Sequence, residues 1–258
     1  MLLKDKAIIV TGSTTGIGEA IARRCVAEGA SVLIHGLEPD LGRRVATDLG
    51  DRAALHIDNL LNPDAPHRLI AATLDTFGRL DGLVNNAANL SRSDLETTDA
   101  DFFDQIMAVN ARAPLLMIQA ALRHLKQSQG SVVNIGSINA YTGEPRLLAY
   151  SMSKAALMAL SRNLANVLAP DKVRVNHFNV GWVLTPNEYR LKISEGLPEG
   201  WSDHPDPADV PTGRMTQPEE IAAHAAFWLS DDSRPISGSV IELEQYPIIG
   251  RIPLKEGQ

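Results

Sequence analysis

A tyrosine and a lysine four residues apart, Tyr150 and Lys154, are the side chains of this sequence best suited to move a proton. Positions i and i+4 lie on one face of a helix, one above the other. A phenol ordinarily titrates near ~10, and a nearby ammonium favours the phenolate and lowers that pKa. The spacing also fits an ordinary solvated helix face, but in a crevice it predicts an acid/base tyrosine that exchanges a proton with an alcohol or carbonyl oxygen.

The elements that must position this pair alternate regularly along the chain. Apolar runs predict strands at Ala7–Val10, Val32–Ile34, Ala53–Ile57, Gly82–Val84, Val132–Ile135, Val173–Phe178 and Ser239–Leu243. Amphipathic stretches predict helices at about 17–28, 40–49, 64–77, 101–125, 150–168 and 218–230. Uniformly apolar strands that alternate with helices are typical of a parallel sheet covered on both faces. We therefore expect one α/β domain over 1–258, a doubly wound sheet of about seven strands, with its crevice at the strands' carboxyl ends.

Composition narrows the function class. The 258 residues are 44% hydrophobic, which is enough for a sizeable core, and the formal net charge of −7 argues against a nucleic-acid partner. The single cysteine, Cys25, falls in an apolar helical pattern and is expected to be a core residue. The sequence shows no secretory signal and no apolar run of membrane-spanning length, so we expect a cytoplasmic protein with no membrane partner. The seven histidines show no ligand spacing, so no metal is expected.

One segment interrupts the alternation of strands and helices. Residues 186–218 carry several prolines among many charged residues and follow a predicted strand at its carboxyl end. An insertion of this length in a compact domain is usually a functional loop or is disordered. We expect a lid over the crevice.

A glycine-rich turn, Thr11-Gly-Ser-Thr-Thr-Gly-Ile-Gly18, lies between the first predicted strand and the first predicted helix. Gly12 allows a tight turn, Gly16 lets the backbone approach a pyrophosphate, and Gly18 permits close packing of helix on strand. The phosphate would bind at the helix N-terminus. In this context the turn predicts nucleotide binding rather than a simple tight turn.

Polar residues also follow the third and fourth predicted strands. Asp58, followed by Asn59, could accept a hydrogen bond from an adenine amino group, although a helix cap or turn residue is an equally good interpretation. Asn85 and Asn86, followed by two alanines, close the fourth strand, where asparagine side chains satisfy exposed backbone groups.

Five motifs in this order, TGSTTGIG, NNAA, Asn110, Ser137 and YSMSK, resemble the classical short-chain dehydrogenase/reductase family over about residues 4–245. The resemblance implies a single-domain Rossmann-type fold that binds NAD(H) or NADP(H). It implies an enzyme that oxidises alcohols or reduces carbonyls, assembled as a homotetramer or homodimer.

The resemblance also assigns roles to residues. Tyr150 becomes the acid/base residue, and Lys154 lowers its pKa and bonds the nicotinamide ribose. Ser137 bonds the reacting oxygen, and Asn110 positions a water in the proton relay. The residues implied to contact the cofactor are Gly12, Ser13, Thr14, Thr15, Gly16, Ile17, Gly18, Gly36, Leu37, Asp58, Asn59, Asn86, Ala87, Ala88, Tyr150, Lys154, Gly181, Val183 and Thr185.

The sequence departs from the family pattern where the second strand ends. NAD-preferring relatives carry an aspartate there, and NADP-preferring relatives a basic residue nearby, whereas this chain has Gly36 and Leu37. A 2′-phosphate would meet Glu38, and its charge of about −1.5 to −2 would be repelled. We expect a slight preference for NAD, which Arg43 or Arg44 could overturn by reaching back.

Two further departures lie toward the end of the chain. The usual Pro-Gly after the sixth strand is Val180-Gly181, which predicts a less rigid turn because valine does not fix φ. The segment 246–258 forms an apolar tail, and we expect it to reach the substrate site of a neighbouring subunit.

The candidate substrate residues are mostly polar. They are Asn139, Arg146, Trp182 and Glu188, with Arg92, Tyr189, Arg190, Trp201 and His204 as further lining positions. This set favours a sugar, polyol or hydroxy acid. A 3-oxoacyl-thioester (acyl-carrier-protein) reductase is the alternative enzyme. A non-catalytic nucleotide-binding sensor or scaffold is the alternative class, and the intact set of four catalytic motif residues argues against it.

Overall fold

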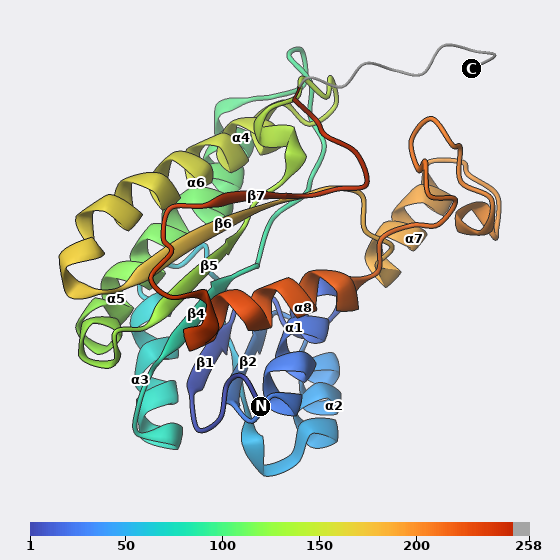
Figure 1. Cartoon of the computed structure of the whole chain (residues 1–258). Coiled ribbons are helices and arrows are strands. Elements are labelled where there is room, and N and C mark those ends of the chain that lie inside the picture. The colour runs from blue at the N-terminus through green and yellow to red at the C-terminus, as the bar shows by residue number, and fades with distance from the viewer. Residues whose placement is uncertain (250–258) are drawn as a thin grey trace.

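The computed structural model describes residues 1–249, and its centre is a parallel sheet of seven strands in the order β3-β2-β1-β4-β5-β6-β7 (Figure 1). The strands are β1 (Ala7–Val10), β2 (Ser31–Gly36), β3 (Ala53–Ile57), β4 (Gly82–Asn85), β5 (Ser131–Ile135), β6 (Arg174–Val180) and β7 (Val240–Leu243). The doubly wound α/β fold expected from the sequence is confirmed. Residues 250–258, most of the tail expected to reach a neighbouring subunit, lie outside the described residues.

Helices cover both faces of the sheet (Figure 1). They are α1 (Gly16–Ala27), α2 (Pro39–Leu49), α3 (Ala65–Phe77), α4 (Ala100–Met107), α5 (Ala113–Ser128), α6 (Leu148–Val167), α7 (Pro186–Ser194) and α8 (Pro218–Leu229). Helices α1, α2 and α8 pack on one face and α3, α5 and α6 on the other. The helix α7 stands beside the sheet rather than over a face (Figure 1).

Two apolar cores explain why the strands are hydrophobic throughout. Successive strand side chains point to opposite faces, so Ile8 and Val10 join the core beneath α1 and α8, while Ile9 joins the core beneath α3 and α5. All three residues are fully buried. A strand with a helical layer on each side therefore needs an apolar residue at every position.

The functional edge of the sheet follows from the strand order. The chain runs outward from β1 to β2 and β3, then returns to place β4 on the other side of β1. Such a reversal opens a crevice at the carboxyl ends of the two neighbouring strands. The segments that follow β1, β4, β5 and β6 all leave the sheet at this edge.

The single helix expected over 101–125 is wrong. Helix α4 ends at Met107, a π-helical turn spans Ala108–Arg112, and α5 begins at Ala113. Pro114 has no N–H to donate to the carbonyl of Asn110, and its ring crowds that carbonyl, so a regular α-helix cannot continue through this point. A π-helical turn of this kind is frequent at functional sites, and here it holds Asn110.

The reactivity of the Cys25 thiol reports how tightly the face of the sheet beneath α1 is packed. Its side chain is fully buried, and burial raises the pKa of the thiol to about 12. We expect no reaction of the native protein with a disulfide reagent such as DTNB at pH 8, because only about one thiol in 10⁴ would be ionised. One thiol should react once urea unfolds the chain. Rapid labelling of the native protein would contradict this packing.

Candidate active site

Helix α6 carries the predicted acid/base pair into the crevice. Tyr150 and Lys154 are 7% and 2% exposed, so both polar ends are enclosed by protein. The ammonium Nζ of Lys154 donates to the carbonyl oxygen of Ile135, the last residue of β5, at 2.7 Å. The same Nζ lies 5.6 Å from the centre of the Tyr150 ring. The lysine is therefore fixed between the end of a strand and the tyrosine.

The pKa of Tyr150 is raised in this arrangement, and the effect of Lys154 on it stays a prediction. Burial raises the pKa of Tyr150 to about 12, a hydrogen bond with Ser137 opposes that rise, and the carboxylate of Glu188 adds to it. Burial also lowers the pKa of Lys154 to about 8. Desolvation disfavours the charged form of each group. Tyr150 is consequently a protonated phenol at neutral pH, poised to donate.

Ser137 joins Tyr150 from the neighbouring strand. It follows β5 by two residues, begins a short 3-10 turn, and accepts a hydrogen bond from the N–H of Asn139 at 3.2 Å. Its hydroxyl bonds that of Tyr150. The two hydroxyls thus lie together and can contact one substrate oxygen. Asn139 itself uses its side-chain oxygen to accept from Thr142 at 2.9 Å.

Asn110 reaches the site from the π-helical turn. Its amide oxygen accepts from the N–H of Asn89 at 2.7 Å, and its amide nitrogen donates to the Asn89 carbonyl at 2.9 Å and to Ser153 at 3.0 Å. Ser153 adjoins Lys154 on α6. Asn110 therefore ties the loop after β4 to α6 through three hydrogen bonds.

The glycine-rich turn fits a dinucleotide phosphate. Gly12 and Gly16 have φ angles of 62° and 58°, a region that only glycine enters readily. A Cβ at Gly18 would collide with the carbonyl oxygen of Gly12, so the helix start packs directly on the turn. Thr15 precedes α1 without a side-chain hydrogen bond to its first turn. No side-chain cap from Thr15 occupies the N–H groups at this helix start, which could therefore donate to an anion.

Polar contacts fasten the turn to β4. The amide of Asn86 donates to the carbonyl oxygens of Thr11 and Gly12 at 2.9 and 3.0 Å, and Ala87 packs against Gly12. This structural use of Asn86 agrees with the expectation for an asparagine at a strand end.

A buried histidine that sequence reasoning missed supports the turn from the other side. The N–H of Gly12 donates to Nδ1 of His35 at 3.2 Å, so Nε2 carries the proton and donates to the carbonyl oxygen of Asp58 at 3.1 Å. Burial lowers the pKa of His35 to about 4, which keeps the ring neutral in this role. Only the pairing of β2 with β1 and β3 brings these groups together.

An acidic residue lies where the second strand ends. Glu38 accepts from the Thr14 hydroxyl at 2.8 Å and from the N–H of Leu37 at 3.2 Å. Thr14 also fills the space beside Gly36, where a Cβ would not fit. A carboxylate is thus held against the glycine-rich turn, two residues beyond the position at which the family resemblance placed one.

Asp58 is already engaged by protein groups. Arg68 donates to both of its carboxylate oxygens at 2.7 and 2.9 Å, and the N–H of Asn59 donates to one of them at 2.8 Å. These bonds hold the pKa of Asp58 at about 2. The Asn59 side chain instead caps the following turn by accepting from Leu61. The contacts of Asn59 agree with the turn interpretation, and the side chain of Asp58 is engaged mainly by Arg68.

The loop after β6 is held by an acid rather than by proline. The N–H of Trp182 donates to Glu244 at 3.0 Å, and the Glu244 carboxylate fills the space beside Gly181. Glu244 thus supplies a contact to the turn in which Val180 stands in place of the family's proline. Val183 is buried and pairs with Thr216 as an isolated bridge.

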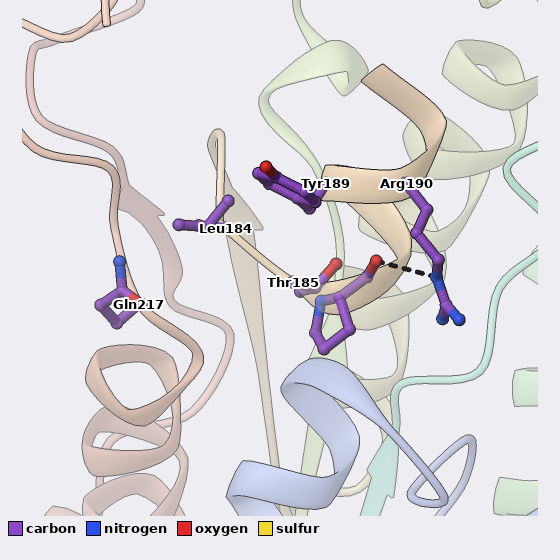
Figure 2. Close-up of a pocket in the computed structure, with 6 residues that line it drawn as sticks. Leu184, Thr185, Tyr189, Arg190 and Gln217 are labelled. Carbon is purple, nitrogen blue, oxygen red and sulfur yellow. Dashed lines mark hydrogen bonds between the residues drawn. The ribbon is translucent and has the colours of Figure 1, made fainter. Parts of the chain in front are cut away.

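Thr185 begins α7 and closes the crevice against the turn. Its hydroxyl accepts from the N–H of Glu188 at 3.1 Å, and its methyl lies 3.4 Å from where a Gly16 Cβ would be. Figure 2 shows the pocket beside it, with α1 passing below. This pocket has a volume of about 480 Å³ and is lined by Leu184, Thr185, Pro186, Tyr189, Arg190 and Gln217.

Aromatic residues join the segment 186–218 to the body of the protein. The rings of Trp182 and Trp201 stack with centres 5.4 Å apart, and Tyr189 stacks on Trp201 at 6.0 Å. Nε1 of Trp182 donates to Glu188 at 2.8 Å. Of the predicted substrate residues, Glu188 lies close enough for its charge to raise the pKa of Tyr150, Trp182 is bonded to Glu188, and His204 is exposed.

Comparison with known proteins decides the family. A family model described as Enoyl-(Acyl carrier protein) reductase matches residues 12–244. Dehydrogenase/reductase SDR family member 4 of Sus scrofa is 32% identical over 93% of this chain and 86% of that protein. The chain belongs to the classical short-chain dehydrogenase/reductase family. It is an oxidoreductase that acts on hydroxyl or carbonyl groups with a nicotinamide cofactor.

Two other similar proteins carry more specific names. L-fucose dehydrogenase of Mus musculus is 35% identical to this chain. The matched region covers 88% of this chain and 82% of the mouse protein. The crystal structure of 3-ketoacyl-(acyl-carrier-protein) reductase from Brucella melitensis complexed with NADH superposes with a TM-score of 0.83 at 28% identity. The match covers 94% of this chain and 98% of that one.

Residues 1–249 show neither a membrane-spanning helix nor a cluster of metal-binding side chains. No helix within residues 1–249 is long and apolar enough to cross a membrane. Over the same range no three histidine, cysteine or acidic side chains gather in a way that could hold a metal ion.

Gly18 tests the glycine-rich turn. We expect Gly18→Ala to lower the free energy of unfolding by about 1–3 kcal/mol, because the added methyl overpacks the turn. It should also weaken NADH binding. Urea unfolding and a fluorescence titration measure the two effects. Gly143→Ala is the matched control, since a Cβ there meets nothing within 4 Å. Equal stability of both variants would contradict the packing described.

Proposed function

We propose that this short-chain dehydrogenase/reductase interconverts an alcohol and a carbonyl with Tyr150 as proton donor and acceptor, NAD(H) as its preferred cofactor, and a sugar, polyol or hydroxy acid as substrate. The observation that carries the proposal is the shared placement of three groups. The Tyr150 and Ser137 hydroxyls lie together, and the Lys154 ammonium is fixed beside them by the Ile135 carbonyl.

The nicotinamide supplies or accepts the hydride when bound, so the protein has to orient the reactants and handle the proton. In the reducing direction the protonated phenol of Tyr150 donates to the substrate oxygen. Ser137 holds that oxygen by a hydrogen bond. The Lys154 ammonium then stabilises the phenolate that remains, which burial would otherwise disfavour. In the oxidising direction the same groups act in reverse.

The preference for NAD(H) rests on Glu38. Its carboxylate lies against Thr14 of the glycine-rich turn, where it can accept from ribose hydroxyls and repel a 2′-phosphate. The two arginines that could have overturned this preference are engaged elsewhere. Arg43 pairs with Asp40, and Arg44 donates to Glu19 at 2.8 Å.

The segment 186–218 supports a polar substrate. We take it to be a lid, because α7 carries Glu188 to the vicinity of Tyr150 and the stacked aromatic rings seat the segment on the loop after β6. A carboxylate accepts hydrogen bonds from substrate hydroxyls, and a flat aromatic face suits the ring or chain of a sugar. The similarity to L-fucose dehydrogenase agrees with this class.

A 3-oxoacyl-thioester reductase is the second candidate, favoured by the fold similarity to the Brucella melitensis enzyme. Its substrate carries a long apolar or thioester arm, whereas Glu188, Lys192 and Glu195 lie on the lid of this enzyme. Turnover of an acyl thioester with NADPH, faster than of any sugar or hydroxy acid with NAD(H), would favour this alternative.

Tyr150 separates an enzyme from a nucleotide-binding scaffold. Tyr150→Phe should lower kcat by about 10²–10⁴-fold, because the proton donor is lost. NADH affinity should change little. Steady-state kinetics measure kcat, and a binding titration measures the NADH affinity. Tyr141→Phe is the matched control, because it removes a phenol hydroxyl elsewhere in the protein. Undiminished turnover in Tyr150→Phe would refute the assigned role.

Glu38 tests cofactor choice. We expect NADH to bind more tightly than NADPH to the unaltered protein, and Glu38→Gln to reduce that ratio about tenfold by removing the repelling charge. Parallel fluorescence titrations with the two nucleotides measure the ratio. Asp75→Asn, which removes an exposed acid from α3, should leave it unchanged. Tighter NADPH binding by the unaltered protein would overturn the assignment.

A further inference from the structure

Charged residues of the lid form one row along α7. Glu188, Lys192 and Glu195 follow each other at spacings of four and three residues, so they lie on one side of the helix, with Glu195 at its C-terminal cap. Glu188 bonds Trp182 and raises the pKa of Tyr150, and Lys192 lies 5.6 Å from the Trp182 ring. The row therefore begins beside the catalytic residues and continues away from them.

Arg92, on the loop after β4, meets the far end of this row. Its Nε lies 2.6 Å from one carboxylate oxygen of Glu195, and Nζ of Lys192 lies 2.9 Å from the other. The side chains of Arg92 and Glu195 are only 22% and 21% exposed. Partial burial makes this ion pair stronger than an ordinary surface pair.

Backbone pairing fixes Arg92 near the catalytic helix. The N–H of Ser93 donates to the Arg146 carbonyl at 3.0 Å, and the N–H of Leu148 donates to the Ser93 carbonyl at 3.1 Å. Helix α6 begins at Leu148, two residues before Tyr150. Arg146 is also close enough for its charge to contribute to a lowered pKa of Glu195. Arg92 and Lys192 therefore contact the Glu195 carboxylate, and Arg146 lies within electrostatic range of it.

The Glu195 carboxylate does not satisfy the hydrogen-bonding capacity of these cations. Nε of Arg92 is buried without a hydrogen bond of good geometry, although the Glu195 oxygen is within ion-pair distance. The N–H is thus not directed at the carboxylate it touches. Arg92 and Lys192 both contact Glu195, and two cations on one carboxylate leave a local attraction for a further anion. Guanidinium groups in particular suit a carboxylate.

We propose that Arg92, Arg146 and Lys192 form a subsite for a substrate carboxylate, and that Glu195 is an internal carboxylate that competes for it. This inference rests on the proposed function. The separation of Glu188 from Glu195 along α7 is about 10 Å. The carboxylate of the substrate therefore lies several carbons from the carbon that reacts at Tyr150. The class this fits is a polyhydroxylated acid, such as an aldonic acid, with the hydroxyl chain along Glu188 and Lys192.

The test compares two ligands that differ only at one end. D-gluconate and D-glucitol share a six-carbon hydroxyl chain, and only the first ends in a carboxylate. Calorimetry with the NADH complex of the full chain gives the affinity of each. We expect gluconate to bind about tenfold more tightly or better, from a charge-assisted bond to Arg92. Arg92→Met should abolish that preference, while Glu195→Gln should increase it.

Arg92→Met and Glu195→Gln together distinguish a binding subsite from an ion pair that only holds the segment 186–218 in place. If the Arg92 contact with Glu195 served only to hold the lid, both variants would break it and change the affinities in the same direction. Opposite directions support a competing carboxylate. Lys126→Met is the matched loss of one cation, from an ion pair with Asp171 at the other edge of the sheet, and should change neither affinity.

Three results would overturn the inference. They are equal or absent binding of the two ligands by the unaltered protein, an equal loss of both in Arg92→Met, and a fall of gluconate affinity in Glu195→Gln. Loss of NADH binding in a separate titration would instead be a failure of the proposed function.

Discussion

Desolvation at the carboxyl edge of the sheet governs the chemistry of this protein. Lys154 and Tyr150 lie in a region enclosed on one side by β5 and on the other by α6, and water no longer stabilises their charged forms. The lysine is held at the site because its ammonium donates a hydrogen bond to the carbonyl oxygen of Ile135. The tyrosine stays neutral because the Ser137 hydroxyl does not offset its burial. When the buried phenol loses its proton, the negative charge that forms is stabilised only by the buried ammonium beside it.

The rest of the crevice is built from backbone groups that the sheet leaves at its edge. His35 and Asn86 each bond carbonyl or N–H groups of the glycine-rich turn, and Glu244 does the same for the loop after β6. These polar side chains replace pairing that the strands can no longer provide beyond their ends. Their effect is to fix the glycine-rich turn and the loop after β6 in place through side-chain hydrogen bonds.

The segment 186–218 packs less extensively than this base. Its contacts include a small buried cluster of Trp201, Val210 and Met215 and the half-buried ion pairs of Glu195 with Arg92 and Lys192. Such contacts open at lower free energy than the cores beneath the sheet. The charges on the inner side of α7 therefore have the freedom to exchange partners, which residues packed in a core do not have.

Sequence and tertiary structure contributed different parts of this picture. Periodicity and the order of the glycine turn, the asparagines and the YSMSK segment determined the fold, the strands and the family, because these patterns act over short stretches of chain. Pro114 indicates that the helix is interrupted near Asn110. The continuous amphipathic pattern over 101–125 nevertheless predicts a single helix. The roles of the site residues remain proposals.

Three features were decided only by the folded chain: the neutral state of Tyr150, the clamp made by His35, and the meeting of Arg92 with Glu195. Each depends on burial or on groups far apart in the sequence. A pKa responds to the dielectric around a group, and an ion pair to the distance between two side chains. Neither quantity exists until the strands and helices have packed together.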